Sequence, residues 1–177
     1  MRDDKRSAND DDEELKQKSL TKSKMATILK HAGLEAPNRL ILILDYVLMP
    51  AAKAKDPSER AVRYVLPREM TTEQVLAHFS TIENTEGRPA RIPEFCDWCG
   101  NIYKTLPYTV ALGTSWKEHN DPQEWVAFVD QLDEQRLFTA DRITRVWAKG
   151  TGFLFFVKTK EEPVIAPPVP HPPVTPE

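Results

Sequence analysis

The stretch Ile143–Lys158 (ITRVWAKGTGFLFFVK) holds the strongest hairpin signal in the chain. Two runs rich in β-branched and aromatic residues, 143–147 and 153–158, flank the turn-forming sequence KGTG at 149–152. Glycine favours tight turns because it lacks a Cβ and adopts positive φ without strain. We therefore predict two antiparallel strands joined at this turn, and we expect them to close a core domain near Lys160.

Three apolar segments before this stretch favour strands. Arg39–Met49 (RLILILDYVLM) predicts a long central strand, buried on both faces for much of its length and ended by Pro50. Ala61–Leu66 (AVRYVL) alternates well enough to predict a second strand that pairs with the first in a long hairpin. Pro107–Gly113 (PYTVALG) predicts a third strand.

The clearest helix signal begins at Thr71. This residue is placed as an N-cap, and Gln74 at the third helical position completes a capping box. Met70 and Val75 have the spacing of a hydrophobic staple across the same helix end. The apolar stripe that follows predicts a helix ending near Asn84.

A turn and a second helix are predicted next. The sequence EGRP at 86–89 favours a turn. A short helix is expected to begin at Pro93. Its apolar side would consist of Phe95, Cys99 and Ile102.

A third helix is predicted after residue 120. Asp121 is placed as its N-cap, Pro122 as its first residue and Glu124 in its first turn. Its buried face would consist of Trp125, Phe128, Val129 and Leu132.

The order of these elements indicates the fold class. Strands and helices are interspersed without a regular βαβ repeat, which favours an α+β fold over a doubly wound sheet. We expect one domain at residues 37–160, with a mixed or antiparallel sheet and two to three packed helices. Residues 1–36 are expected to form a charged, flexible arm with a partial helix, and residues 161–177 a proline-rich disordered tail.

The composition is typical of a soluble protein from a reducing compartment. Of the 177 residues, 40% are hydrophobic and 29% charged, and the net charge of -3 argues against a surface wholly dedicated to nucleic acid. Cys96 and Cys99 are too close in sequence to staple distant parts of a fold. We expect no secretory signal and no transmembrane segment, because the first residues lead into acids and Asp45 interrupts the longest apolar run.

The N-terminal arm contains a run of acids at 10–14 followed by clustered lysines. A frayed helix is predicted from Glu13 to Ala32, with Gly33 as its stop. Its docking face would consist of Met25, Ile28, Leu29 and Ala32. The lysines are candidates for contact with an anionic membrane surface or with nucleic acid phosphates; the alternative is a solvated helix face. They are Lys16, Lys18, Lys22, Lys24 and Lys30.

The C-terminal segment 163–177 holds seven of the fifteen prolines. Four of them recur every third residue, and a polyproline II helix would place them on one ridge. These four are Pro167, Pro170, Pro173 and Pro176. The ridge predicts contact with a proline-recognition domain, and the alternative is a plain disordered tail.

No catalytic constellation is predicted. Cys96 and Cys99 have the C-x-x-C spacing of zinc or thiol-exchange sites, but zinc needs two further ligands and the sequence has no second such motif. The favoured interpretation is two small core residues one helical turn apart. No nucleophile-elbow pattern surrounds Ser115, and no phosphate-binding glycine motif occurs. We predict a protein that is not an enzyme and has no metal or cofactor.

In order, the predicted core elements resemble those of rhabdovirus matrix proteins. The pieces that carry the resemblance are the strand 39–49, the capped helix from Thr71, the strand and loop from 102–104 to 113–115, and the segment 149–157. This resemblance covers about 120 residues, and the short chain suits a plant-infecting member of the family.

The resemblance implies a non-enzymatic structural protein that self-associates and condenses the viral nucleocapsid. It further implies a bridge from the nucleocapsid to the inner face of the envelope membrane during assembly and budding, with a location in the virion, the host cytoplasm and the inner membrane face. The lysine arm would contact membrane or nucleocapsid, and Thr114, Ser115 and Trp116 would belong to a self-association loop that ends near Asn120. The alternative function is a cytosolic adaptor or regulator that presents its proline-rich tail to a partner domain.

Overall fold

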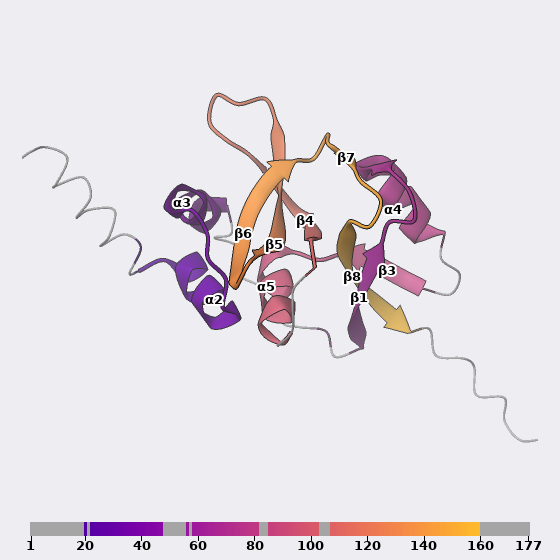
Figure 1. Ribbon diagram of the computed structural model, residues 1–177, viewed down its shortest axis with the longest axis horizontal. Coiled ribbons are helices and arrows are strands. Elements are labelled where there is room, and N and C mark those ends of the chain that lie inside the picture. Colours follow the sequence, from indigo (N-terminus) through magenta and orange to yellow (C-terminus); the bar gives the residue numbers. More distant parts are fainter. Residues whose placement is uncertain are drawn as a thin grey trace, which may run out of the picture.

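The computed structural model describes residues 20, 22–47, 56, 58–81, 85–102 and 107–159. Within them, helices pack on a mixed six-stranded sheet and a separate two-stranded sheet, which confirms the predicted single α+β domain (Figure 1). The helices number four in this part of the chain, more than the two to three predicted: α2 (Lys24–Ala32), α3 (Asn38–Val47), α4 (Thr72–Ser80) and α5 (Ile92–Gly100). The strands are β1 (Glu59–Val65), β2 (Met70–Thr71), β3 (Thr85–Pro89), β4 (Thr109–Lys117), β5 (Glu124–Leu132), β6 (Gln135–Arg142), β7 (Val146–Trp147) and β8 (Gly152–Thr159).

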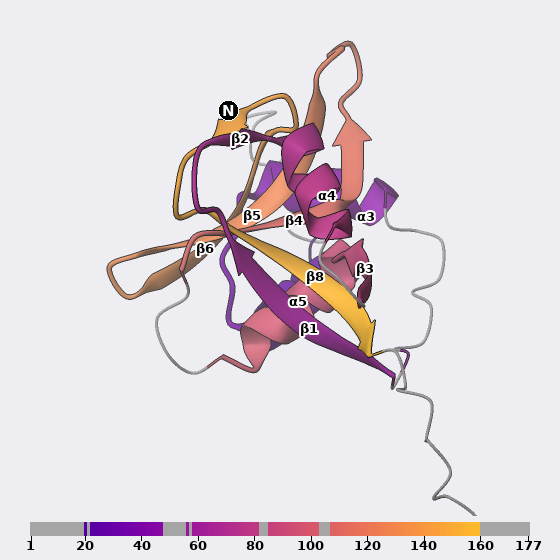
Figure 2. The same cartoon turned by 90° about the vertical axis from the view of Figure 1, so that its right-hand side faces the viewer.

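Strand β8 pairs with three other strands and has partners along both edges. β1 runs antiparallel to it, from Glu59 opposite Lys158 to Val65 opposite Gly152, and Figure 2 shows the two strands side by side. On the other edge, β4 pairs in parallel near Gly152 and β3 pairs antiparallel further along. Since unpaired buried backbone groups are costly, partners on both edges suit a strand in the interior.

Alternate side chains of β8 enter two separate hydrophobic clusters. Leu154 and Phe156 belong to the cluster beneath α2, α3 and α5. Phe153, Phe155 and Val157 belong to the cluster on the other face, beneath α4 and the two-stranded sheet. All five side chains are 5% exposed or less. The strand therefore contributes apolar burial to both layers, at about 1.5–3 kcal/mol for each fully buried side chain.

Strand β4 confirms the predicted strand at 107–113 and extends it to Lys117. Its register with β5 shifts between Ala111 and Ser115. Gly113 lies in this irregular part, where its N–H donates to the carbonyl oxygen of Ala90 at 2.8 Å. A Cβ at Gly113 would clash with the backbone there, so the close approach of the two segments requires glycine.

The predicted central strand at 39–49 is wrong, because these residues form helix α3 up to Val47, and 48–49 lie outside the described residues. The buried residues of α3 are Leu40, Ile41 and Leu44, which share a helical face, whereas a strand would place 40, 42 and 44 together. The run is apolar at almost every position, so strand and helix periods fit it equally well. The predicted hairpin with 61–66 is also absent, since β1 pairs with β8.

The predicted helix after Asp121 is wrong as well, because Glu124–Leu132 forms strand β5 between β4 and β6. Asp121 accepts a hydrogen bond from the N–H of Gln123 at 2.8 Å, but this bond closes a local turn instead of capping a helix. The same side chains serve N-caps and such turns. Pairing with two strands and the bulky residues of WVAFV then favour extended backbone.

The predicted turn at 86–89 and the predicted hairpin around 149–152 need correction. The sequence at 86–89 belongs to strand β3, and Gly87 is required there because a Cβ would clash with the Phe79 ring. The turn at 149–152 is confirmed by Gly150 at φ 89° and by the Thr151 N–H bonding to Ala148, but its flanking strands do not pair. β7 pairs with β2, because the Trp147 side chain is buried against α4 and donates to Thr72 Oγ1.

The locally encoded helix ends are confirmed. Thr71 and Gln74 form the capping box of α4, although the helix ends at Ser80 and not near Asn84. Helix α5 covers the segment predicted from Pro93, and it ends before Ile102. Gly33 adopts the left-handed conformation at the end of α2, as the sequence predicts.

A pair of leucine substitutions tests the helical assignment of α3. Leu44 is fully buried, so Leu44→Ala should destabilise the protein by about 2–5 kcal/mol through lost burial and a cavity. Leu42 is only partly buried on the opposite side of the helix, so Leu42→Ala should cost much less. Urea denaturation of both variants measures the difference. Equal losses would indicate a strand, in which the two side chains share a face.

Candidate interaction surface

Helix α2 presents its lysines on the side that faces away from the core. Met25, Leu29 and Ala32 are buried beneath it, whereas Lys24 and Lys30 are exposed. The docking face is therefore the predicted one, with Ile28 partly buried beside it. Lys22 is also exposed, just before the N-cap Ser23. The candidates Lys16 and Lys18 lie outside the described residues, as do the four prolines of the ridge.

The start of α2 is joined to the end of α3 by a buried polar contact. Asp45 accepts a hydrogen bond from the backbone N–H of Met25 at 2.8 Å, and Ser23 accepts one from Ala26. These bonds satisfy N–H groups that the first turn of a helix leaves free, and the carboxylate also suits the positive end of the helix dipole. The bond joins the start of α2, where the exposed Lys24 lies, to the end of α3, where the exposed Tyr46 lies.

The outward face of α3 lines an apolar groove of about 880 Å³. Tyr46 is 87% exposed, the largest exposed fraction among the large hydrophobic side chains that the structure describes. The opposite wall is the turn between β4 and β5. Arg39 crosses the groove and donates to Glu118 at 2.5 Å, while the nearby Lys117 and His119 side chains are exposed. The groove residues are Asn38, Arg39, Leu42, Ile43, Tyr46, Val47, Lys117, Glu118 and His119.

The predicted self-association residues lie on strand β4 and not in a loop. Thr114 accepts a hydrogen bond from the N–H of Ile92, and Ser115 donates to Glu124. Trp116 is 4% exposed, so it is a core residue at the edge of the α2–α3–α5 layer. The groove is reached instead by Lys117, which ends β4, and by Glu118 and His119 of the turn that follows. Self-association through this segment stays a prediction.

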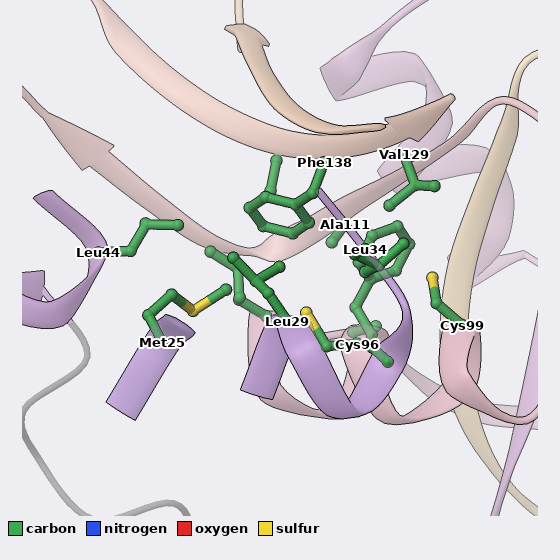
Figure 3. Close-up of a cluster of buried hydrophobic side chains, with 14 of the residues drawn as sticks. Met25, Leu29, Leu34, Leu44, Cys96, Cys99, Ala111, Val129 and Phe138 are labelled. Atoms are coloured by element: carbon green, nitrogen blue, oxygen red, sulfur yellow. The ribbon is translucent and has the colours of Figure 1, made fainter. Parts of the chain in front are cut away.

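Cys96 and Cys99 lie on the buried side of α5, among apolar side chains from α2, β5 and β6 (Figure 3). Both are 0% exposed. Burial raises the pKa of the Cys96 thiol well above its ordinary value and that of Cys99 to about 12. Thiolates are the nucleophilic and metal-binding form of cysteine, so this environment fits two small core residues better than a reactive pair.

Charged side chains meet in a structural network where β1, β3 and α5 converge. Arg88 donates to Glu59 at 2.7 Å and to Glu94 at 2.5 Å, and its guanidinium lies 5.2 Å from the centre of the Phe156 ring. Burial alone would raise the pKa of Glu94, but the hydrogen bonds from Arg88 and from the Arg91 N–H outweigh it and lower the pKa to about 2. The lowered pKa keeps the Glu94 carboxylate ionised as an ion-pair partner of Arg88.

The described residues contain no group of three or more His, Cys, Asp or Glu side chains placed to hold a metal ion. In the same part of the chain, no helix has the length and apolar character needed to cross a membrane. The groove on α3 and the lysine side of α2 are the two candidate interaction surfaces.

Comparisons of the chain with protein-family models, curated proteins and solved structures find no match. Of the segments that carry the matrix-protein resemblance, the capped helix at Thr71 and the strand before 113–115 are present. The segment 39–49 is helical up to Val47, and 149–157 leads into β8 without forming a hairpin. Membership of the matrix-protein family therefore stays a proposal.

Sequence reasoning missed the groove and its link to the lysines. The signal was present in Asp45, the one acid inside an apolar run, whose isolation indicates a specific partner. Finding that partner, the N–H of Met25 twenty residues earlier, required the helical assignment of α3. Tyr46 next to it would then have been recognised as an exposed aromatic residue.

The acid stability of the protein should depend on Glu94. Its pKa of about 2 in the folded protein lies below the ordinary value of 4.5, so its stabilising effect is present above pH 4.5 and is lost as the pH falls towards 2. Glu94→Gln should lower stability at neutral pH and flatten the decline across that range, as measured by urea denaturation at several pH values. The exposed Glu73→Gln serves as control. An unchanged acid profile in Glu94→Gln would rule out this role.

Proposed function

We propose that this protein is a non-enzymatic structural protein of matrix type, which self-associates and bridges a nucleocapsid to the inner face of a membrane. The observation that carries the proposal is the exposed lysine side of α2, fixed to the core by its apolar side. Each lysine near an anionic lipid surface contributes about 1 kcal/mol of attraction. The lysines Lys16 and Lys18 precede this helix and would extend the same basic surface.

The neighbourhood of this helix supports a peripheral membrane contact. The Asp45–Met25 hydrogen bond joins the start of α2 to the end of α3, the helix that carries the exposed Tyr46. Tyrosine has an apolar ring and a polar tip, which suits the boundary between lipid headgroups and acyl chains. Basic residues beside an exposed aromatic ring are the combination that peripheral membrane proteins use.

Flotation with vesicles tests the membrane contact. Full-length protein should float with vesicles containing phosphatidylserine at about 0.05 M salt and detach at about 0.5 M, because salt screens exposed charges. Vesicles of phosphatidylcholine alone should not bind it. The variant with Lys22→Gln, Lys24→Gln and Lys30→Gln should bind more weakly by about fivefold for each lysine.

The matched control is Lys149→Gln, an exposed lysine on the turn between β7 and β8. Figure 1 shows this turn and α2 on opposite sides of the domain. This control should float like the unchanged protein. Binding that ignores lipid charge, or that the triple variant and the control weaken equally, would contradict the assignment of the lysine face.

Self-association is tested separately by sedimentation velocity of the full chain. A structural protein of this type should form larger species as the protein concentration rises and as salt falls. A protein that remains monomeric at every concentration and salt would contradict this part of the proposal, even if it binds vesicles.

A further inference from the structure

Within the part of the chain that the structure describes, the groove beside α3 is an apolar face that no other element covers. Helix α3 buries Leu40, Ile41 and Leu44 on one side, but Leu42, Ile43 and Tyr46 face the groove. A helix that is apolar all round is typically covered on all sides. We therefore expect another apolar segment to bind in the groove and cover this side of α3.

We propose that the occupant is this protein's own proline-rich segment, residues 163–177. Proline-rich ligands in the polyproline II form bind grooves lined with exposed aromatic side chains, since the preformed helix loses little entropy on binding. The groove supplies such a side chain in Tyr46, at 87% exposure, flanked by aliphatic residues. The segment supplies a proline at every third position from 167 to 176, with valines between them.

The dimensions of the two partners agree. A helix of ten residues is about 15 Å long at 1.5 Å per residue, which sets the length of the groove wall formed by α3. A polyproline II segment rises about 3.1 Å per residue, so about five residues of the segment would span this wall. With about five of the residues 160–177 in the groove, about thirteen remain, and these reach about 40 Å beyond the end of β8. This reach is comparable to the diameter of about 30–40 Å expected for a domain of this size.

The charges also complement one another. Arg39, Lys117 and His119 lie along the groove, and Glu118 is already bonded to Arg39. Residues 160–177 contain three glutamates and one lysine, with two of the glutamates just before the prolines. Acidic residues that flank an apolar segment would therefore meet a rim with an excess of basic groups, which favours this occupant over a basic ligand.

This inference goes beyond the proposed function, because the contact requires neither a membrane nor assembly. It gives the proline ridge a binding site on the protein itself. The segment would then cover the apolar face of α3 and keep Tyr46 from other partners. A competing partner would have to displace it, so the groove and the segment would be released together.

Paramagnetic broadening of NMR signals in the full-length protein tests the proposal. A spin label is attached through Ala166→Cys, at the start of the ridge; Cys96 and Cys99 are buried and should not react with the reagent. Amide signals of 42–47 and 117–119 should lose most of their intensity, while those of 149–151, at the opposite end of β8 from the attachment of the segment, should not. An excess of unlabelled synthetic peptide 163–177 should restore the lost intensity by competition.

Matched substitutions make the test specific. Tyr46→Ala removes a side chain that is 87% exposed, so the fold should persist while the selective broadening disappears. Leu132→Ala, at an exposed apolar residue that ends β5, should leave the broadening unchanged. Broadening that is absent, or spread evenly over the surface, overturns the proposal. Since neither vesicles nor assembly enter this experiment, its failure would leave the flotation and sedimentation results intact.

Discussion

The structure depends on burying both faces and pairing both edges of strand β8. Leu154 and Phe156 hold the layer of α2, α3 and α5, while Phe153, Phe155 and Val157 hold the layer of α4 and the two-stranded sheet. β8 thus contributes five buried side chains to the two clusters, and β4 and β5 also supply residues to both. Loss of the packing of β8 would therefore destabilise both layers at once. In the intact domain, the same packing gives the surface helices a rigid base.

On this base, a single polar contact organises the candidate interaction surface. The Asp45 carboxylate bonded to the Met25 N–H fixes the start of α2 against the end of α3. The helix that carries the lysine side and the helix that lines the groove are therefore fixed to one another at these ends. Their chemistry is complementary to two kinds of partner: anionic surfaces for the lysines, and an apolar extended segment for the groove.

The sequence predicted the features that local chemistry encodes. The capping box at Thr71 and the left-handed stop at Gly33 are confirmed, because each depends on residues within one helical turn. Features decided by distant residues were not predictable in the same way. The run at 39–47 fits both periods until its neighbours are known, and Asp121 closes a turn because β5 has strand partners on both sides. For the candidate site, the lysines were predictable from their clustering, but the groove exists only once α3 and the β4–β5 turn come together.

The central claim is that a rigid body contacts an anionic surface through the exposed side of α2. Hydrogen–deuterium exchange of the full chain, with and without phosphatidylserine vesicles, tests it most directly. Backbone amides at residues 22–33 should exchange more slowly when vesicles are present, while those of β8 should exchange at unchanged rates. Unchanged exchange at 22–33 in protein that is bound to the vesicles would contradict the account, as would faster exchange throughout β8.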